Sequence, residues 1–157
     1  MSTNIDINSK SKVRNLAEWP ISYERINTPG DEYLKANSVI YINNAEIESQ
    51  VQNGNKFFTG TGTGDHARLF IENPDLREYL GFDNKTEGKT QFILDEEKCK
   101  QILEYKTFSV FKKHLEEDIV TNHEKAKIMN YARKTKLNDY EKIQEIEKYC
   151  QMKFNNE

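Results

Sequence analysis

The feature of this chain that most constrains its fold is a change of hydrophobic period near residue 95. Before this point the apolar residues stand in short runs rich in β-branched and aromatic side chains, which is typical of strands. After it they recur at spacings of three, four and seven residues, which is typical of amphipathic helices. The change predicts an α+β protein, in which an N-terminal β-rich sandwich or small barrel is followed by a three-helix C-terminal unit.

The same change divides the chain into parts. At 157 residues there is room for one domain, or for one domain with a small appendage. The polar, aperiodic stretch 1–10 predicts a flexible arm. Residues 11–94 are the expected β-rich domain, and residues 95–157 form a helical unit that packs on this domain or is appended to it.

Turn residues locate the expected strands. Pro20 follows a tryptophan and separates two strands, and Pro29-Gly30 suits a type II turn. The run VIYIN predicts a strand over residues 39–43, and KTQFIL predicts a last strand over residues 89–94. Asn44 is the expected N-cap of a short helix that stops at Gly54.

Cap residues locate the other expected helices. Asn73, followed by a proline, predicts one or two helical turns. Asp95 is the expected cap of one long helix up to residue 119, and Thr121 with Glu124 forms a capping-box pattern. Asn138-Asp139 starts the third helix of the C-terminal unit. The apolar stripe of the first of these helices comprises Cys99, Ile102, Leu103, Val110, Phe111, Leu115 and Ile119.

Large apolar side chains predict the β core. We expect this core to contain Trp19, Phe57, Phe58, Leu69 and Phe70, together with Tyr23 or Ile21. Adjacent residues on a strand point to opposite faces of the sheet, so Phe57 and Phe58 can both be buried only if both faces are covered. The C-terminal helical stripe is the expected second cover.

The loop GTGTGD, residues 60–65, invites a phosphate-binding interpretation. A Walker loop needs a lysine and a hydroxyl residue after the glycines, and a dinucleotide fingerprint needs a helix there. Neither is present, because the strand-like run ARLFIE follows. We therefore expect the tip of a β-hairpin between strands KFFTG and ARLFIE, and an anion-binding nest is the alternative. Asp65 cannot easily orient His66 on a strand, because neighbouring side chains point apart.

Four residues are of the types that bind zinc: Cys99, His114, His123 and Cys150. Cys99 and His114 are fifteen positions apart on one expected helix, which is about 22 Å at 1.5 Å per residue. Zinc ligands must converge on one ion. We expect core cysteines in a reducing cytoplasm, and no metal, cofactor or catalytic residue.

The charge of the chain is close to balanced, with 23 basic and 26 acidic residues. This composition gives no global attraction to nucleic acid or to an anionic membrane. Apolar runs such as VIYI are too short to cross a bilayer, and the stretch MSTNIDINSKSK lacks the apolar core of a secretory leader.

Two sets of residues are candidates for interaction. Ile5 and Ile7 lie on the same side of the arm if it is extended, so the arm could add as an edge strand to a neighbouring subunit. Arg133, Lys134 and Lys136 form a small basic group that could contact nucleic acid.

Three stretches together carry a resemblance: KVRNLAEWPISYERINTPGD, then EIESQVQNGNKFFTG with DHARLFIENPDLREYLGFD, then KLNDYEKIQEIEKYC. They resemble small structural, virion-associated proteins of tailed bacteriophages and prophages, from about Lys12 to Cys150. The resemblance implies a non-enzymatic virion protein, with a β-rich docking part and a helical part, attached to the head or head–tail region. Its partners would be other virion proteins, in a homo-oligomer or in many copies on a symmetric assembly. It would be found in the virion, and in the host cytoplasm during assembly.

Two other functions stay open at this point. The chain could be a small interaction module, a regulator or anti-defence inhibitor that binds a host protein. It could also bind nucleic acid weakly through its C-terminal helices.

Overall fold

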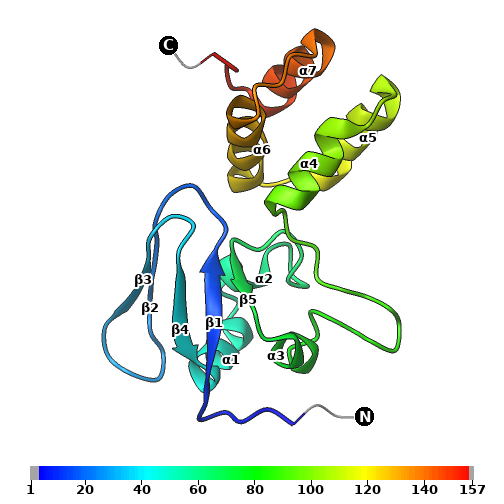
Figure 1. Cartoon of the computed structure of the whole chain (residues 1–157). Coiled ribbons are helices and arrows are strands. Elements are labelled where there is room, and N and C mark those ends of the chain that lie inside the picture. The colour runs from blue at the N-terminus through cyan, green and yellow to red at the C-terminus, as the bar shows by residue number, and fades with distance from the viewer. Residues whose placement is uncertain (1–3, 156–157) are drawn as a thin grey trace. The chain divides into compact units, whose positions relative to one another are not determined.

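The computed structural model describes residues 4–155 of the chain. The fold is mixed α+β and consists of two compact units, which divide between Ile93 and Leu94. Each unit has its own hydrophobic core. Figure 1 shows the strands in the first unit and an all-helical second unit.

The first unit is built around a small antiparallel sheet. Strand β1 (Lys10–Asn15) lies between β4 (Val39–Asn43) and β5 (Leu69–Ile71) and pairs antiparallel with both. Strands β2 (Ile21–Glu24) and β3 (Asp31–Leu34) form a separate hairpin. The described strands do not close into a barrel, so that expectation was wrong, and the expected sandwich is not confirmed.

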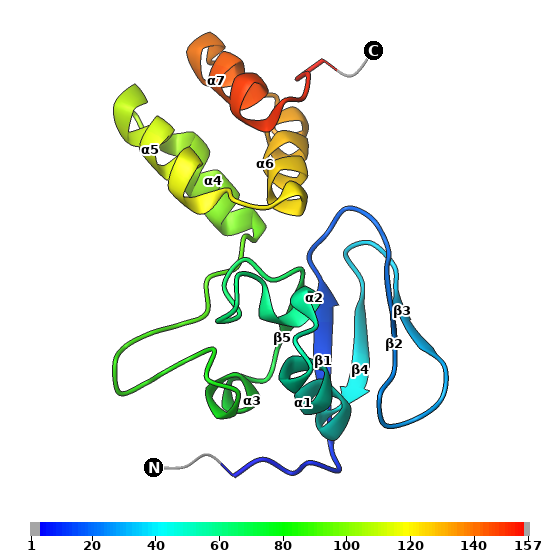
Figure 2. The same ribbon diagram turned by 180° about the vertical axis from the view of Figure 1, so that it is seen from behind.

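Three short helices complete the first unit: α1 (Asn44–Gln52), α2 (Lys56–Thr59) and α3 (Pro74–Tyr79). The expected cap at Asn73 is confirmed, because its side chain accepts the N–H groups of the first turn of α3. At α1 the cap is Asn43, one residue before the expected position, and its Oδ1 accepts the N–H of Ala45 over 2.9 Å. In both views α1 lies beside β1 and β4 (Figure 2).

The first core lies on one face of the sheet. Alternation along β1 buries Ser11, Val13 and Asn15 and turns the residues between them outward. Val13 belongs to one core with side chains from the other strands and from all three helices. The fully or almost fully buried apolar members of this core are Val13, Ala17, Ile21, Tyr23, Leu34, Ile42, Ile47, Phe58, Leu69, Ile71, Leu76 and Phe82.

The expected hairpin around the glycine loop is wrong. Residues 56–59 form a helix because the Asn55 side chain accepts the N–H of Phe57 over 3.0 Å and caps it. Phe57 and Phe58 therefore do not lie on opposite faces of a strand. Phe58 is buried, Phe57 packs half-buried on the core, and Phe70 lies on the other face of β5.

The expected strand over residues 89–94 is absent from the described structure, apart from a single bridge between Asn84 and Lys89. Its backbone bonds with the glycine loop instead of with a neighbouring strand. The N–H of Phe92 donates to Asp65 Oδ1 over 2.7 Å, and the Phe92 carbonyl accepts the N–H of His66 over 2.8 Å.

The second unit contains four helices within the described residues, instead of the expected three: α4 (Glu96–Glu104), α5 (Phe108–Asp118), α6 (Asn122–Lys134) and α7 (Tyr140–Cys150). The long helix expected up to residue 119 is interrupted at residues 105–107. The cap expected at Asp95 and the capping box at Thr121 are confirmed. The helix expected to start at Asn138-Asp139 is also confirmed, with Asp139 as its N-cap.

The helical stripe is buried inside the second unit's own core. Cys99, Phe111, Leu115 and Ile119 have no exposed surface, whereas Val110 is exposed. Residues of α6 and α7, such as Ile128 and Ile146, pack against them. The stripe therefore covers the other helices of its own unit.

Candidate interaction surface

The face of the sheet turned away from the core carries a row of cations. Alternation along β1 directs Lys10, Lys12 and Arg14 to this side, where the two lysines are exposed and Arg14 is half-buried. The register places Lys12 opposite Tyr41. It places Arg14 opposite Val39 on β4 and opposite Phe70 on β5. We call this surface the outer face, defined by Lys10, Lys12, Arg14, Val39, Tyr41, Asn43 and Phe70.

The charges of the outer face are only partly neutralised. Arg14 Nε lies 2.7 Å from Glu72 Oε1, which forms an ion pair. Lys12 Nζ lies 5.9 Å from the centroid of the Tyr41 ring, within the range of a cation–π contact. Within the described residues Lys10 and Lys12 are in no ion pair, so they give the face an excess of positive charge.

Tyr41 is the main exposed ring of this face, with 60% of its surface accessible. Phe70 is half-buried, because the guanidinium of Arg77 lies 4.8 Å from the centroid of its ring. Arg77 itself is held by an ion pair with Asp83 over 3.0 Å. The outer face therefore combines one exposed aromatic ring with neighbouring lysine ammonium groups.

The edge of β4 that faces away from β1 is open. At the two ends of the β1–β4 ladder, the backbone N–H of Asn15 donates to Ser38 O and the backbone N–H of Asn44 donates to Ser9 O. Bonded pairs alternate along an antiparallel ladder, so Ile40 and Ile42 bond to β1 while the peptide groups of Val39, Tyr41 and Asn43 point outward. No strand pairs with this edge in the described part of the chain.

The two isoleucines of the N-terminal arm lie against the first unit. Ile7 O accepts the N–H of Ala45 over 3.1 Å, and Ile5 packs on the core. Both line a small pocket of about 30 Å³ with Leu76 and Tyr79. The structure thus brings Ile5 and Ile7 together, folded back on their own unit, and residues 1–3 of the arm lie outside the described residues. The mobility of the arm in solution stays a prediction.

The structure does not bring Arg133, Lys134 and Lys136 together as one cationic surface. Arg133 Nε donates to Phe154 O over 2.8 Å, and its guanidinium also contacts Asn130. Lys134 pairs with Glu96 over 3.1 Å. Only Lys136, just beyond the helix, is exposed without an ion pair in the described structure.

The glycine loop is held by its own backbone. Gly62 and Gly64 both donate to Thr59 O over 2.8 Å, and Thr61 donates to Asp65 O over 3.0 Å. An anion-binding nest needs these N–H groups to be available, and here they already have carbonyl partners. The loop therefore has a structural role.

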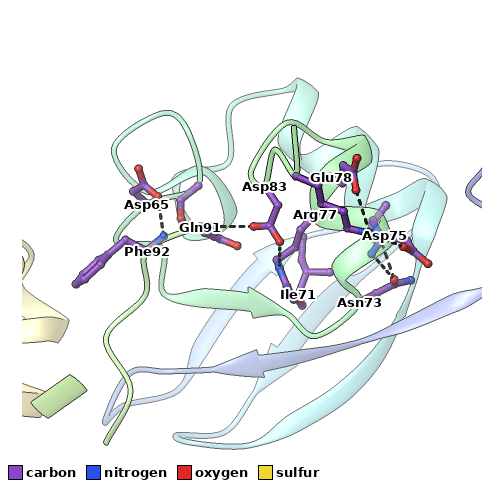
Figure 3. A network of polar contacts seen from close by, with 12 residues as sticks. Asp65, Ile71, Asn73, Asp75, Arg77, Glu78, Asp83, Gln91 and Phe92 are labelled. Carbon is purple, nitrogen blue, oxygen red and sulfur yellow. Dashed lines mark hydrogen bonds and ion pairs between the residues drawn. The ribbon is translucent and has the colours of Figure 1, made fainter. Parts of the chain in front are cut away.

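Side chains clamp the glycine loop to the segment that follows α3. Gln91 Nε2 donates to Gly64 O over 2.5 Å, and the N–H of Gln91 donates to Asp83 Oδ1 over 2.8 Å. Figure 3 shows Asp83 between Gln91 and Arg77. Asp65 accepts from Phe92 N–H and from the Thr63 hydroxyl, and the ring of His66 lies 4.8 Å from the ring of Phe92. These carboxylates hold the fold together.

The four residues of zinc-binding type lie in different environments. Burial raises the pKa of the Cys99 thiol to about 12 and that of Cys150 to about 11, which disfavours the thiolate that binds metal. The ring of His114 stacks on Tyr105 at 4.4 Å. His123 is buried, with Nδ1 at 2.6 Å from the Thr121 hydroxyl. In the described part of the chain no three His, Cys, Asp or Glu residues are grouped as metal ligands would be.

Sequence reasoning missed the outer face. The sequence feature that could have indicated this face is KSKVR, in which cations stand at every second position. The recognisable strand VIYIN, which pairs with it, comes later in the chain.

None of the helices in residues 4–155 is both long and apolar enough to span a membrane. Comparisons with protein families, with curated proteins and with solved structures found no match to this chain.

Proposed function

We propose that this protein is a non-enzymatic structural protein of a tailed bacteriophage particle, attached to the head or head–tail region by contacts with other virion proteins. The observation that supports the proposal best is the open edge of β4. The resemblance of the sequence to virion-associated proteins supports it independently.

The composition of β4 makes its edge suitable for pairing. Natural edge strands are usually shortened, charged or interrupted by proline, because free N–H and C=O groups recruit other strands. The strand VIYIN is five residues long and contains neither a charged residue nor a proline. A strand from a partner could bond to the outward peptide groups of Val39 and Tyr41 without disturbing the β1 ladder.

Two variants at one position test this contact. Tyr41→Pro removes an N–H that points away from β1, so the β1–β4 bonds are kept while strand addition is blocked. Tyr41→Thr removes the ring but keeps the N–H, and is the matched control. In particles produced with each version, mass spectrometry should detect the wild type and the threonine variant, and the proline variant should be strongly depleted.

Absence of the wild-type protein from purified particles would overturn the virion proposal. If the Tyr41→Pro variant were incorporated as well as the wild type, the β4 edge would not be the contact with other virion proteins. If affinity capture from bacterial lysate instead returned one stoichiometric host protein, the regulator or anti-defence interpretation would replace it.

A further inference from the structure

We propose that the outer face binds single-stranded nucleic acid, with phosphates on Lys10 and Lys12 and a base stacked on Tyr41. This proposal goes beyond a role in protein contacts, because it rests on side chains of the outer face and not on the β4 edge. Proteins that bind single strands without sequence preference combine a cationic track with exposed aromatic rings. The outer face has both.

The cationic track runs along β1. Lys10, Lys12 and Arg14 occupy alternate positions of one strand, so neighbouring cations are separated by about 6.6–6.8 Å along it. Consecutive phosphates of an extended single strand can therefore meet consecutive cations. Arg14 is already paired with Glu72, which leaves the two lysines as the phosphate-binding groups.

The stacking surface lies beside this track. Tyr41 is opposite Lys12 in the register, and its ring is 60% exposed. A base on the Tyr41 ring would have its phosphate near the Lys12 ammonium, which lies 5.9 Å from the ring centroid. An acidic peptide could pair with the lysines but has no planar base to stack on the ring. This pairing of ring and cation favours nucleic acid over an acidic protein segment.

The overall charge of −3 does not oppose a local site. Charges beyond a Debye length, about 8 Å at physiological salt, are largely screened at an exposed surface. Glu72 is the acidic residue opposite Lys12 in the extended β1–β5 register, and it is engaged by Arg14.

Fluorescence anisotropy with a labelled oligothymidylate of about twelve nucleotides tests the site, because such a strand covers a typical single-strand site. The full-length protein should bind it, and affinity should fall as salt is raised from about 50 to about 200 mM. The double variant Lys10→Ser, Lys12→Ser should reduce the slope of log affinity against log salt by about 1.4, or about 0.7 per lost phosphate contact. Tyr41→Thr should weaken binding about tenfold at constant slope.

The matched control removes the same charge elsewhere. Lys100 and Lys113 are exposed lysines of the second unit, and Lys100→Ser, Lys113→Ser should leave both affinity and slope unchanged. Circular dichroism melts show whether each variant is folded. The proposal is overturned if the wild type shows no salt-sensitive binding, or if the control weakens binding as much as the outer-face variant. It is also overturned if Tyr41→Thr binds as tightly as the wild type, or if polyglutamate competes as well as unlabelled oligothymidylate, which would indicate an acidic protein partner.

Discussion

Lys142 donates a hydrogen bond from Nζ to the carbonyl oxygen of Leu103 over 2.6 Å, and the same ammonium lies 5.3 Å from the centroid of the Phe111 ring. Leu103 is in the last turn of α4, where carbonyl groups lack partners within the helix. Lys142 is only 8% exposed. One side chain of α7 therefore joins the end of α4 to the start of α5.

Replacing this lysine with methionine should destabilise the helical unit. Lys142→Met keeps most of the apolar stem but leaves Leu103 O without its charged donor, and we expect a loss of about 1–3 kcal/mol in unfolding free energy. Urea unfolding followed by circular dichroism measures the loss. Lys148→Met, at an exposed position of the same helix, should stay within about 0.5 kcal/mol of the wild type. Equal losses in the two variants would contradict this role.

The break between α4 and α5 explains why three helices were expected where four occur. The apolar stripe keeps a helical phase from Leu103 to Phe111, so the sequence pattern alone favours one continuous helix. In such a helix Tyr105 and His114 would be about 13.5 Å apart along the axis. In the structure their rings stack at 4.4 Å. Thr107 is the N-cap residue of α5, and tertiary contacts, including the one from Lys142, hold the two helices at the break.

Glu46 on α1 holds the turn between β2 and β3. Its carboxylate accepts the N–H of Ile26 over 3.0 Å, the N–H of Asn27 over 2.8 Å, and the Gln50 amide over 2.8 Å. Burial alone would raise the pKa of Glu46, but these donors and the nearby Arg25 outweigh it and lower the pKa below its ordinary value of 4.5. The charged form is thus favoured by folding.

The depressed pKa of Glu46 makes stability depend on pH. A carboxylate with a lower pKa in the folded state stabilises fully above its unfolded pKa of about 4.5 and loses this contribution as pH falls through the folded pKa. Glu46→Gln should therefore cost about 1–3 kcal/mol at pH 7 and progressively less below pH 4.5. Denaturant titrations across pH measure the difference, with the exposed Glu87→Gln as control. A difference from wild type that is constant over pH would contradict the assignment.

The two cysteines should be inert in the folded protein. Burial raises the pKa of Cys99 to about 12 and of Cys150 to about 11, and the thiolate is the reactive form. At pH 8 we expect both to react with a disulfide reagent more than about a hundredfold slower than a free cysteine. In denaturant the reaction should be fast for both. Rapid labelling of either thiol under native conditions would show that its helix opens readily.

Some strands of the first unit were predictable from the sequence, but the interaction surface of the unit was not. VIYIN was expected as a strand over residues 39–43, and the structure confirms it as β4. Whether a strand lies at an edge depends on which partners pair with it, and pairing between distant segments such as β1 and β5 has no local signal. Lys10 and Lys12 could be recognised as part of an interaction surface only from the register, which places Tyr41 opposite Lys12.

In the glycine loop an expected turn was attached to the wrong kind of element, because helix α2 and not a strand precedes it. Gly62 and Gly64 have φ values of +123° and +88°. KFFTG was expected as a strand because its aromatic residues favour strands. The Asn55 cap and the burial of Phe58 against the core overrode that preference and produced α2.

Substitution of the two glycines should separate backbone strain from packing. At Gly62 an added Cβ meets no atom within 4 Å, so Gly62→Ala should cost only the strain of positive φ, about 1 kcal/mol. At Gly64 the added Cβ would lie 2.5 Å from Cγ of the buried Phe82. Overpacking a core costs about 1–3 kcal/mol more, so Gly64→Ala should lose about 2–4 kcal/mol in total. Thermal and urea unfolding of both variants measure these losses. The double variant Gly64→Ala, Phe82→Ala tests the cause, because removing Cγ and the ring of residue 82 should recover part of the Gly64→Ala loss relative to Phe82→Ala alone. Strictly additive losses would mean that the contact between residues 64 and 82 does not set the cost.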